Sequence, residues 1–162
     1  MINFDSLPKD KPNVLPAKGR YFATIVAAEM KQPADQTKNP YLNLRLSLKN
    51  EKGANAGTIF DRLSESDKPL MQYKLQRFLR ATDIEFSGSF TLKDIQKIVM
   101  NKELIVDVTI SAQQGYPDKA EIDLFTGDMY YKLSEAKDLF GGVSDDVIKA
   151  SDADDANVAE EF

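Results

Sequence analysis

Strict alternation of leucine with polar residues over residues 41–49 (YLNLRLSLK) constrains the fold of this chain more than any other feature. Successive side chains of a β-strand point to opposite faces, so the segment predicts a half-buried strand. Its four leucines must face a core. The opposite face carries Tyr41, Asn43, Arg45 and Lys49, which combine an aromatic ring, an amide and two cations. We therefore expect a sheet with one packed face and one face open for binding.

The other predicted elements occur in a recognisable order along the chain. The hydrophobic patterns predict strands over residues 20–31, 58–63, 103–111 and 120–125, and helices over residues 66–82 and 91–100. Residues 126–143 have no clear pattern. Three strands, a helical insertion and two more strands make up the order of an OB-fold, a five-stranded Greek-key barrel. The chain is thus expected to be mainly β and OB-fold-like, with helices between strands 3 and 4.

The ends of the chain differ from its middle. Residues 1–18 contain three prolines and predict an extended lead-in to a domain over residues 19–143. Residues 144–162 hold seven acidic residues and one lysine, a net charge of −6. The remaining 20 basic and 19 acidic residues give the rest of the chain a net charge of +1. So acidic a segment cannot bury enough apolar surface to fold alone, and we predict a disordered tail.

Composition excludes several classes of function. The chain has no His and no Cys, which excludes histidine-dependent triads, thiolate chemistry and disulfides. No apolar run approaches the ~20 residues of a transmembrane helix, and the N-terminus lacks the order of a secretory signal. We therefore expect a cytoplasmic protein that has no membrane partner and needs no metal or cofactor.

Three strand aspartates are the candidates for a metal-dependent nuclease, which would need several converging carboxylates. They are Asp61, Asp107 and Asp123. Each stands alone among core residues of its strand, and we interpret them as solvent-facing positions. The cluster of Lys74, Arg77 and Arg80 is interpreted as a solvated helix face, with support of phosphates as the second interpretation. No nucleophile–base pair stands out, so no catalytic residue is predicted.

The polar face of the second strand has the groups that bind a single nucleic-acid strand, because aromatic rings stack bases and cations follow phosphates. An OB-fold binds on the surface of strands 2 and 3, with help from flanking loops. The predicted contacts are Tyr41, Asn43, Arg45 and Lys49 on strand 2, Phe60 and Arg62 on strand 3, and Lys38, Lys52 and Tyr116 in neighbouring loops. The alternative is an ordinary solvent-exposed strand face that binds no ligand.

The acidic tail ends in an aromatic residue, Phe162. A terminal ring with an adjoining α-carboxylate can be captured by a pocket and a cation of a partner protein. The preceding acids would steer the tail to basic surfaces and could compete with DNA for the chain's own groove. The predicted partner-binding residues are Asp154, Asp155, Glu160, Glu161 and Phe162. A tail that only improves solubility is the alternative.

An OB-like body with an acidic tail ending in Phe resembles bacterial and bacteriophage single-stranded DNA-binding proteins. The body is also similar to a phage family often encoded beside recombination genes. The motifs are Gly-x-Tyr-x-Ala-x-Ile-x-x-Ala-Glu over residues 19–29, Tyr-Leu-Asn-Leu-x-Leu over 41–46 and Gly-x-x-Phe-Asp-Arg-Leu over 57–63. In the group that this chain resembles, the tail recruits replication and recombination enzymes and masks the DNA groove. This chain departs from the cellular proteins in lacking Trp and in ending Glu-Glu-Phe.

The prediction is therefore a non-catalytic, sequence-tolerant protein that coats single-stranded DNA in phage replication and recombination, in the cytoplasm of a bacterial host. Its tail would bind replication and recombination proteins, and the sequence leaves its oligomeric state open, a homo-oligomer included. The alternative is an adaptor or virion assembly module that uses the tail as a hook and binds no DNA. RNA binding through the same face is not separable by sequence, because no feature reads a 2′-hydroxyl.

Overall fold

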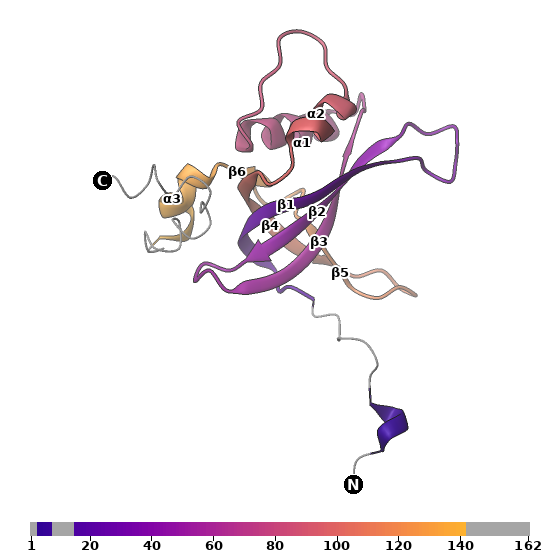
Figure 1. Ribbon diagram of the computed structural model, residues 1–162, viewed down its shortest axis with the longest axis vertical. Helices are drawn as coiled ribbons and strands as arrows, with labels where there is room; N and C mark the ends of the chain where they lie inside the picture. The colour runs from indigo at the N-terminus through magenta and orange to yellow at the C-terminus, as the bar shows by residue number, and fades with distance from the viewer. Residues whose placement is uncertain (1–2, 8–14, 142–162) are drawn as a thin grey trace.

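The computed structural model describes residues 3–7 and 15–141 and is built around one antiparallel sheet with helices at its margins (Figure 1). The strands are β1 (Gly19–Lys31), β2 (Tyr41–Lys49), β3 (Asn55–Ser64), β4 (Glu103–Ser111), β5 (Lys119–Ile122) and β6 (Tyr130–Tyr131). The helices are η1 (Phe4–Ser6), α1 (Pro69–Ala81), α2 (Leu92–Ile98), η2 (Leu133–Glu135) and α3 (Ala136–Phe140). The prediction of a mainly β chain with helices inserted between the third and fourth strands is confirmed.

The strands lie in the order β3-β2-β1-β4-β5, and β6 pairs separately with β4. All five pairings are antiparallel. The two outer strands, β3 and β5, come into contact but form no hydrogen-bonded ladder with each other. The sheet is thus open along one line, between β3 and β5.

The leucines of β2 form the middle of the core. Leu42, Leu44, Leu46 and Leu48 are all fully buried, while Arg45 between them is exposed. The alternation in the sequence therefore gives the inner and outer faces of this strand correctly.

The inserted helices cover one end of the sheet, where they lie together in Figure 1. Phe78 of α1 is fully buried and meets the ring of Tyr130 edge-on, with the ring centroids 5.4 Å apart. Helix α2 begins with a capping box, in which the side chains of Thr91 and Asp94 each accept from the other's backbone N–H. The predicted apolar positions Leu92, Ile95 and Val99 are buried.

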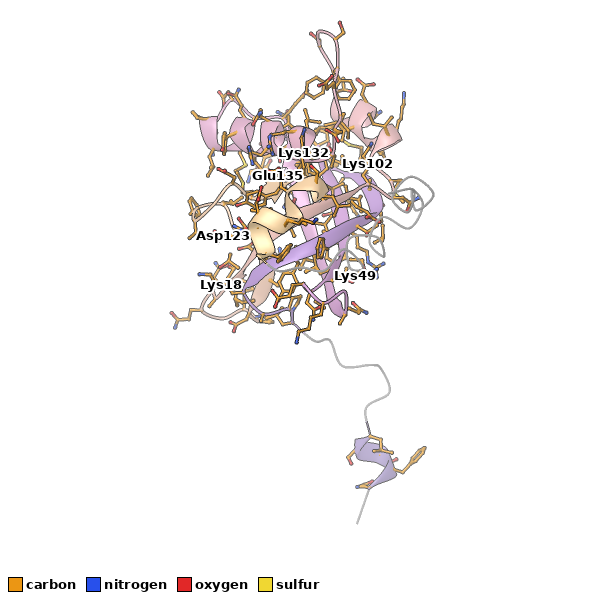
Figure 2. The ribbon with its side chains drawn as sticks, turned by 90° about the vertical axis from the view of Figure 1, so that its left-hand side faces the viewer. Lys18, Lys49, Lys102, Asp123, Lys132 and Glu135 are labelled. Atoms are coloured by element: carbon orange, nitrogen blue, oxygen red, sulfur yellow. The ribbon has the colours of Figure 1, made fainter. Side chains whose placement is uncertain are left out.

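A second, smaller apolar cluster lies on the outer side of β1 and β4. Phe22, Ile105 and Tyr131 pack there beneath α3, and the rings of Phe22 and Phe140 are 4.8 Å apart. Figure 2 shows α3 lying across β1. Helix α3 therefore covers the outer face of β1 and β4, whereas none of the described elements covers the outer face of β2 and β3.

The elements after β4 differ from the prediction. The fifth strand is shorter than expected and ends at Ile122, because Asp123 accepts hydrogen bonds from the backbone N–H groups of Phe125 and Thr126 and turns the chain. Residues 126–143, for which no element was predicted, contain β6, η2 and α3. Among the described residues, no helix is long and apolar enough to cross a bilayer.

Candidate nucleic-acid interface

The outer face of β2 and β3 brings together the six strand residues predicted to bind DNA. In the β2–β3 register, Arg45 lies opposite Phe60 and Asn43 lies opposite Arg62. Phe60 is 54% exposed, and its strand neighbours Ile59 and Asp61 are buried. An aromatic ring and two guanidinium groups thus lie side by side on a face that is not covered by any helix the structure describes.

Arg62 and Tyr41 form a stacked pair on this face. The guanidinium carbon of Arg62 lies 4.4 Å from the centroid of the Tyr41 ring. Such a cation–π contact holds the guanidinium flat against the ring. The ring of Tyr41 is therefore covered on one side by Arg62, and a base would stack on the other side of the guanidinium or on Phe60.

Apart from Arg62, the cations of this face and its adjoining loops have no side-chain partner among the described residues. Neither Arg45 nor Lys49 forms a side-chain hydrogen bond or ion pair with any residue that the structure describes, and the same holds for Lys38 and Lys52 in the adjoining loops. A cation without a carboxylate partner keeps its full attraction for phosphate. These four side chains can therefore respond to a polyanion.

The predicted loop residues flank the face unequally. Lys38 lies in the β1–β2 loop before the start of β2, and Lys52 lies in the β2–β3 turn after its end. Figure 2 shows Lys49 at the end of the sheet away from Lys132 and Glu135. Tyr116 is 68% exposed on the β4–β5 turn and does not line the pocket beside the face. The two lysines therefore flank β2 in the chain, whereas Tyr116 belongs to the turn between β4 and β5.

An open pocket of about 480 Å³ adjoins this face, between β3 and β5. Phe60, Arg62 and Asn43 line it from β3 and β2, and Lys119 and Glu121 line it from β5. The prediction missed Lys119 and Glu121. Their alternation with the buried residues Ala120 and Ile122 was the signal that could have placed them on the outer face.

The floor of the pocket is a buried ion pair. Lys74 Nζ lies 2.7 Å from Asp61 Oδ1 and donates a second hydrogen bond, of 2.8 Å, to the carbonyl of Arg62. The hydroxyl of Tyr130 donates to Asp61 Oδ2. Burial, followed by the charge of Asp61 and this hydrogen bond, raises the pKa of Tyr130 well above its usual value. The interpretation of Asp61 and Lys74 as solvent-facing residues is therefore wrong.

The exposure of Lys74 was predicted wrongly because the prediction followed from its charge and not from its position on the helix. It lies four residues before Phe78 and seven before Ala81, so it shares the buried face of α1 with them. A lysine on such a face needs a buried acceptor, and β3 supplies Asp61.

The other two cations of α1 also contact residues of the same chain. Arg77 donates 3.2 Å to the carbonyl of Tyr130, and Arg80 lies 2.9 Å from Glu135. The hydrogen bond from Arg80 lowers the pKa of Glu135. These contacts fix the segment after β5 against the helix. The prediction of a solvated helix face is therefore wrong for Arg77 as well, whose side chain is mostly buried.

Asp107 is likewise buried and paired, not exposed as predicted. Its carboxylate accepts from Arg20 Nε at 2.7 Å and from the Tyr131 hydroxyl at 2.7 Å. The hydrogen bond to Asp107 raises the pKa of Arg20, and burial followed by the same carboxylate raises the pKa of Tyr131. This network joins β1, β4 and β6 and presents no open coordination position.

Asp123 is the third strand aspartate whose predicted exposure is wrong, because it is 95% buried. Its carboxylate accepts from the backbone N–H groups of Phe125 and Thr126 and from the Thr126 hydroxyl. The hydroxyl contact, followed by the backbone contacts, lowers the pKa of Asp123 against the opposing effect of burial. Within the described ranges, no three acidic side chains come together in a group that could hold a metal ion.

The predicted partner-binding residues Asp154, Asp155, Glu160, Glu161 and Phe162 lie outside the described residues. So do residues 1–2 and 8–14, which are half of the predicted lead-in. The tail hypothesis therefore stays a prediction.

A family model described as "Protein of unknown function (DUF669)" matches residues 2–129, which include the whole path from β1 to β5 and every residue that lines the pocket. The chain belongs to this family. A search of curated proteins gave no match.

Proposed function

We propose that this family member is a sequence-tolerant single-stranded DNA-binding protein without catalytic activity. The observation that carries the proposal is the uncovered face of β2 and β3, where Arg45 and Lys49 lack partners among the described residues beside the exposed ring of Phe60. Unpaired cations and open aromatic faces are what a groove for single strands needs. Several charges elsewhere on the body are paired within the chain, as in Arg20–Asp107, Lys74–Asp61 and Arg80–Glu135.

The strand order supports an OB-fold reading of the sheet. The order β3-β2-β1-β4-β5 becomes a closed five-stranded barrel if β3 and β5, which already touch, are taken as its seam. Helices between β3 and β4 are in the place where OB-folds carry theirs. In that fold, the surface of strands 2 and 3 is the usual site for oligonucleotides.

We further propose that the protein coats exposed strands in phage replication and recombination, and that its tail recruits partner enzymes. The support is the resemblance of residues 19–29, 41–46 and 57–63 to phage proteins of this kind, together with the acidic ending at Phe162. The last described element before the tail is α3, whose Phe140 packs against Phe22, and Phe22 is the register partner of Lys49. We propose that the net charge of −6 in the tail lets it compete with DNA for the groove.

The test is a fluorescence titration of the full chain with labelled oligo-dT and with a duplex of equal length. We expect single-strand binding whose log affinity falls linearly with log salt concentration. Arg45→Ala and Lys49→Ala should each reduce the slope by about 0.7. The matched control is Lys93→Ala, which removes an exposed lysine from α2 and should leave the slope unchanged.

Equal affinity for both DNAs, or affinity for neither, would contradict the proposal. The absence of DNA binding would favour the adaptor alternative. Removal of residues 144–162 should tighten DNA binding, and a weaker complex after truncation would argue against masking by the tail.

A further inference from the structure

The pocket beside the binding face passes through the sheet. Its lining includes Arg62 and Phe60, which point outward from β3, but also Asp61 and Ile122, which point inward from β3 and β5. Residues of both faces can line one pocket only where the sheet is open, and β3 and β5 form no ladder. The opening therefore gives the outer face a depth that a continuous sheet would lack.

Size and wall chemistry suit a planar polar ring. The volume of about 480 Å³ lies in the lower part of the range of ~300–1,000 Å³ typical of small-molecule pockets. Phe60 and the stacked Arg62 form flat walls on one side, and Ile122 and Leu124 form an apolar wall on the other. Arg62 and Lys119 bring positive charge to the rim, where a phosphate would lie.

A groove that binds only the phosphates of a strand does not explain the presence of Glu121 in the pocket. It lines the pocket from β5 and forms no hydrogen bond or ion pair with any residue the structure describes. A carboxylate repels the phosphates of a bound strand, so its presence there is unfavourable unless the ligand supplies a hydrogen-bond donor. Exocyclic amino groups of bases are such donors, and carboxylates accept from the N4 amino group of cytosine.

Asn43 adds a second unpaired polar group to the same pocket, from β2. Its amide can donate to the ring nitrogen or carbonyl beside an amino group. Thymine presents two carbonyl oxygens flanking a single N–H, so a carboxylate meets repulsion on both sides of its one donor. The pair of Glu121 and Asn43 thus fits amino-bearing bases better than thymine.

We propose that this pocket takes one nucleotide of the bound strand and favours bases that carry an exocyclic amino group. The proposal rests on the single-strand binding proposed above and adds a base preference at one position of an otherwise tolerant groove. Phe60 and the guanidinium of Arg62 stack the base, Glu121 accepts from its amino group, and Lys119 meets the adjoining phosphate.

The experiment compares the affinities of the full chain for oligo-dC and oligo-dT of equal length. Their bases have the same ring size and differ in the group at C4, in the proton at N3 and in the C5 methyl group of thymine. The measured quantity is the ratio of the two dissociation constants, for the wild type and for Glu121→Gln. The variant removes the charge but keeps the shape, and its amide can serve either base. We expect it to reduce the preference for oligo-dC at least about fivefold relative to the wild type.

Glu29→Gln is the matched control, because Glu29 lies on β1 opposite Asn43, on the same face but outside the pocket. It removes the same charge and should raise both affinities equally, leaving the ratio as in the wild type. Glu121→Ala, which removes the acceptor altogether, should lower the preference at least as far as Glu121→Gln.

The outcomes separate the two proposals. If both oligonucleotides bind and Glu121→Gln leaves the ratio at the wild-type value, the base pocket is refuted while single-strand binding stands. If the ratio changes equally in Glu29→Gln, the effect is one of general charge and the pocket is again refuted. If the wild type binds neither oligonucleotide, the proposed function itself fails.

Discussion

Arg62 lies flat over the ring of Tyr41, with its guanidinium carbon 4.4 Å from the ring centroid. The two residues come from neighbouring strands, and Arg62 lies opposite Asn43, two positions along β2 from Tyr41. This diagonal contact fixes a side chain that would otherwise move freely in solvent. Under the proposed function, a base would stack on the exposed side of the guanidinium.

The stacked pair predicts that Arg62→Lys weakens single-strand binding although the charge is kept. A lysine has a point charge and no plane to stack on, so the platform is lost. We expect a lower affinity for oligo-dT with an unchanged salt slope, measured by titration at several salt concentrations. Arg45→Lys is the control, because Arg45 stacks on no described ring and should tolerate the exchange. Equal losses in both variants would contradict a special role for Arg62.

Phe60→Ala should reduce single-strand affinity by a factor corresponding to the stacking of one base, on the order of 1–3 kcal/mol. The ring is 54% exposed, so its removal leaves no cavity in the core and the folded state should persist by circular dichroism. Phe4→Ala tests specificity, since Phe4 is 84% exposed on η1, which lies away from the sheet in Figure 1. An affinity that is the same in Phe60→Ala and the wild type would count against base stacking at this position.

Lys74→Met or Asp61→Leu alone should lower the free energy of unfolding by about 3–5 kcal/mol, because each leaves a buried charge without its partner. The double variant should cost less than the sum of the two single variants, and urea unfolding of all four proteins measures this coupling. Lys93→Met, at an exposed position of α2, should change stability by less than about 0.5 kcal/mol. Strictly additive effects would show that the two residues do not act as a pair.

The sequence pattern is sufficient to predict the strands and the face on which β2 carries its cations. Period-two alternation fixes which side chains share a face, so Leu44 and Arg45 were assigned to opposite sides without any knowledge of neighbours. Phe60 and Arg62 followed from the same rule once Ile59 was taken as buried.

The buried carboxylates could not be derived in this way. Asp61 alternates with exposed residues, as an inward-facing residue does, but its charge favours an exposed position. Its partners Lys74 and Tyr130 lie 13 and 69 residues away in the sequence. Such pairings depend on tertiary contacts that no local pattern encodes. The pocket was missed for the same reason, since it exists only where the distant strands β3 and β5 meet.

Acid should destabilise the wild type more than Asp123→Asn. Hydrogen bonds lower the pKa of Asp123 below its usual value of 3.8, so the folded state binds this proton less readily than the unfolded state. The carboxylate therefore stabilises the fold above about pH 4, and this contribution is lost as the pH falls through its folded-state pKa. Urea unfolding at pH 7, 4 and 3 should give a difference between the two proteins that shrinks with acidity. A constant difference would contradict the assignment.

Gly127→Ala should destabilise the segment around β6. A Cβ at this position would lie 2.6 Å from Asp107 Oδ2 and 2.9 Å from the Tyr131 hydroxyl, inside the network that also holds Arg20. We expect a loss on the order of 1–3 kcal/mol in thermal or urea unfolding. Gly19→Ala is the comparison, because its nearest neighbour would be 3.9 Å away. If the two variants are equally stable, the network can shift freely to accommodate a methyl group.

The missing ladder between β3 and β5 creates a trade-off between stability and recognition. Hydrogen bonds along this line would close the sheet and strengthen it, but they would also fill the pocket through which the outer face reaches Asp61 and Lys74. The chain instead satisfies part of the free edge of β3 with a lysine from α1. Substitutions that introduce hydrogen bonds between β3 and β5 should therefore raise the free energy of unfolding and weaken the preference of the pocket for one base over another.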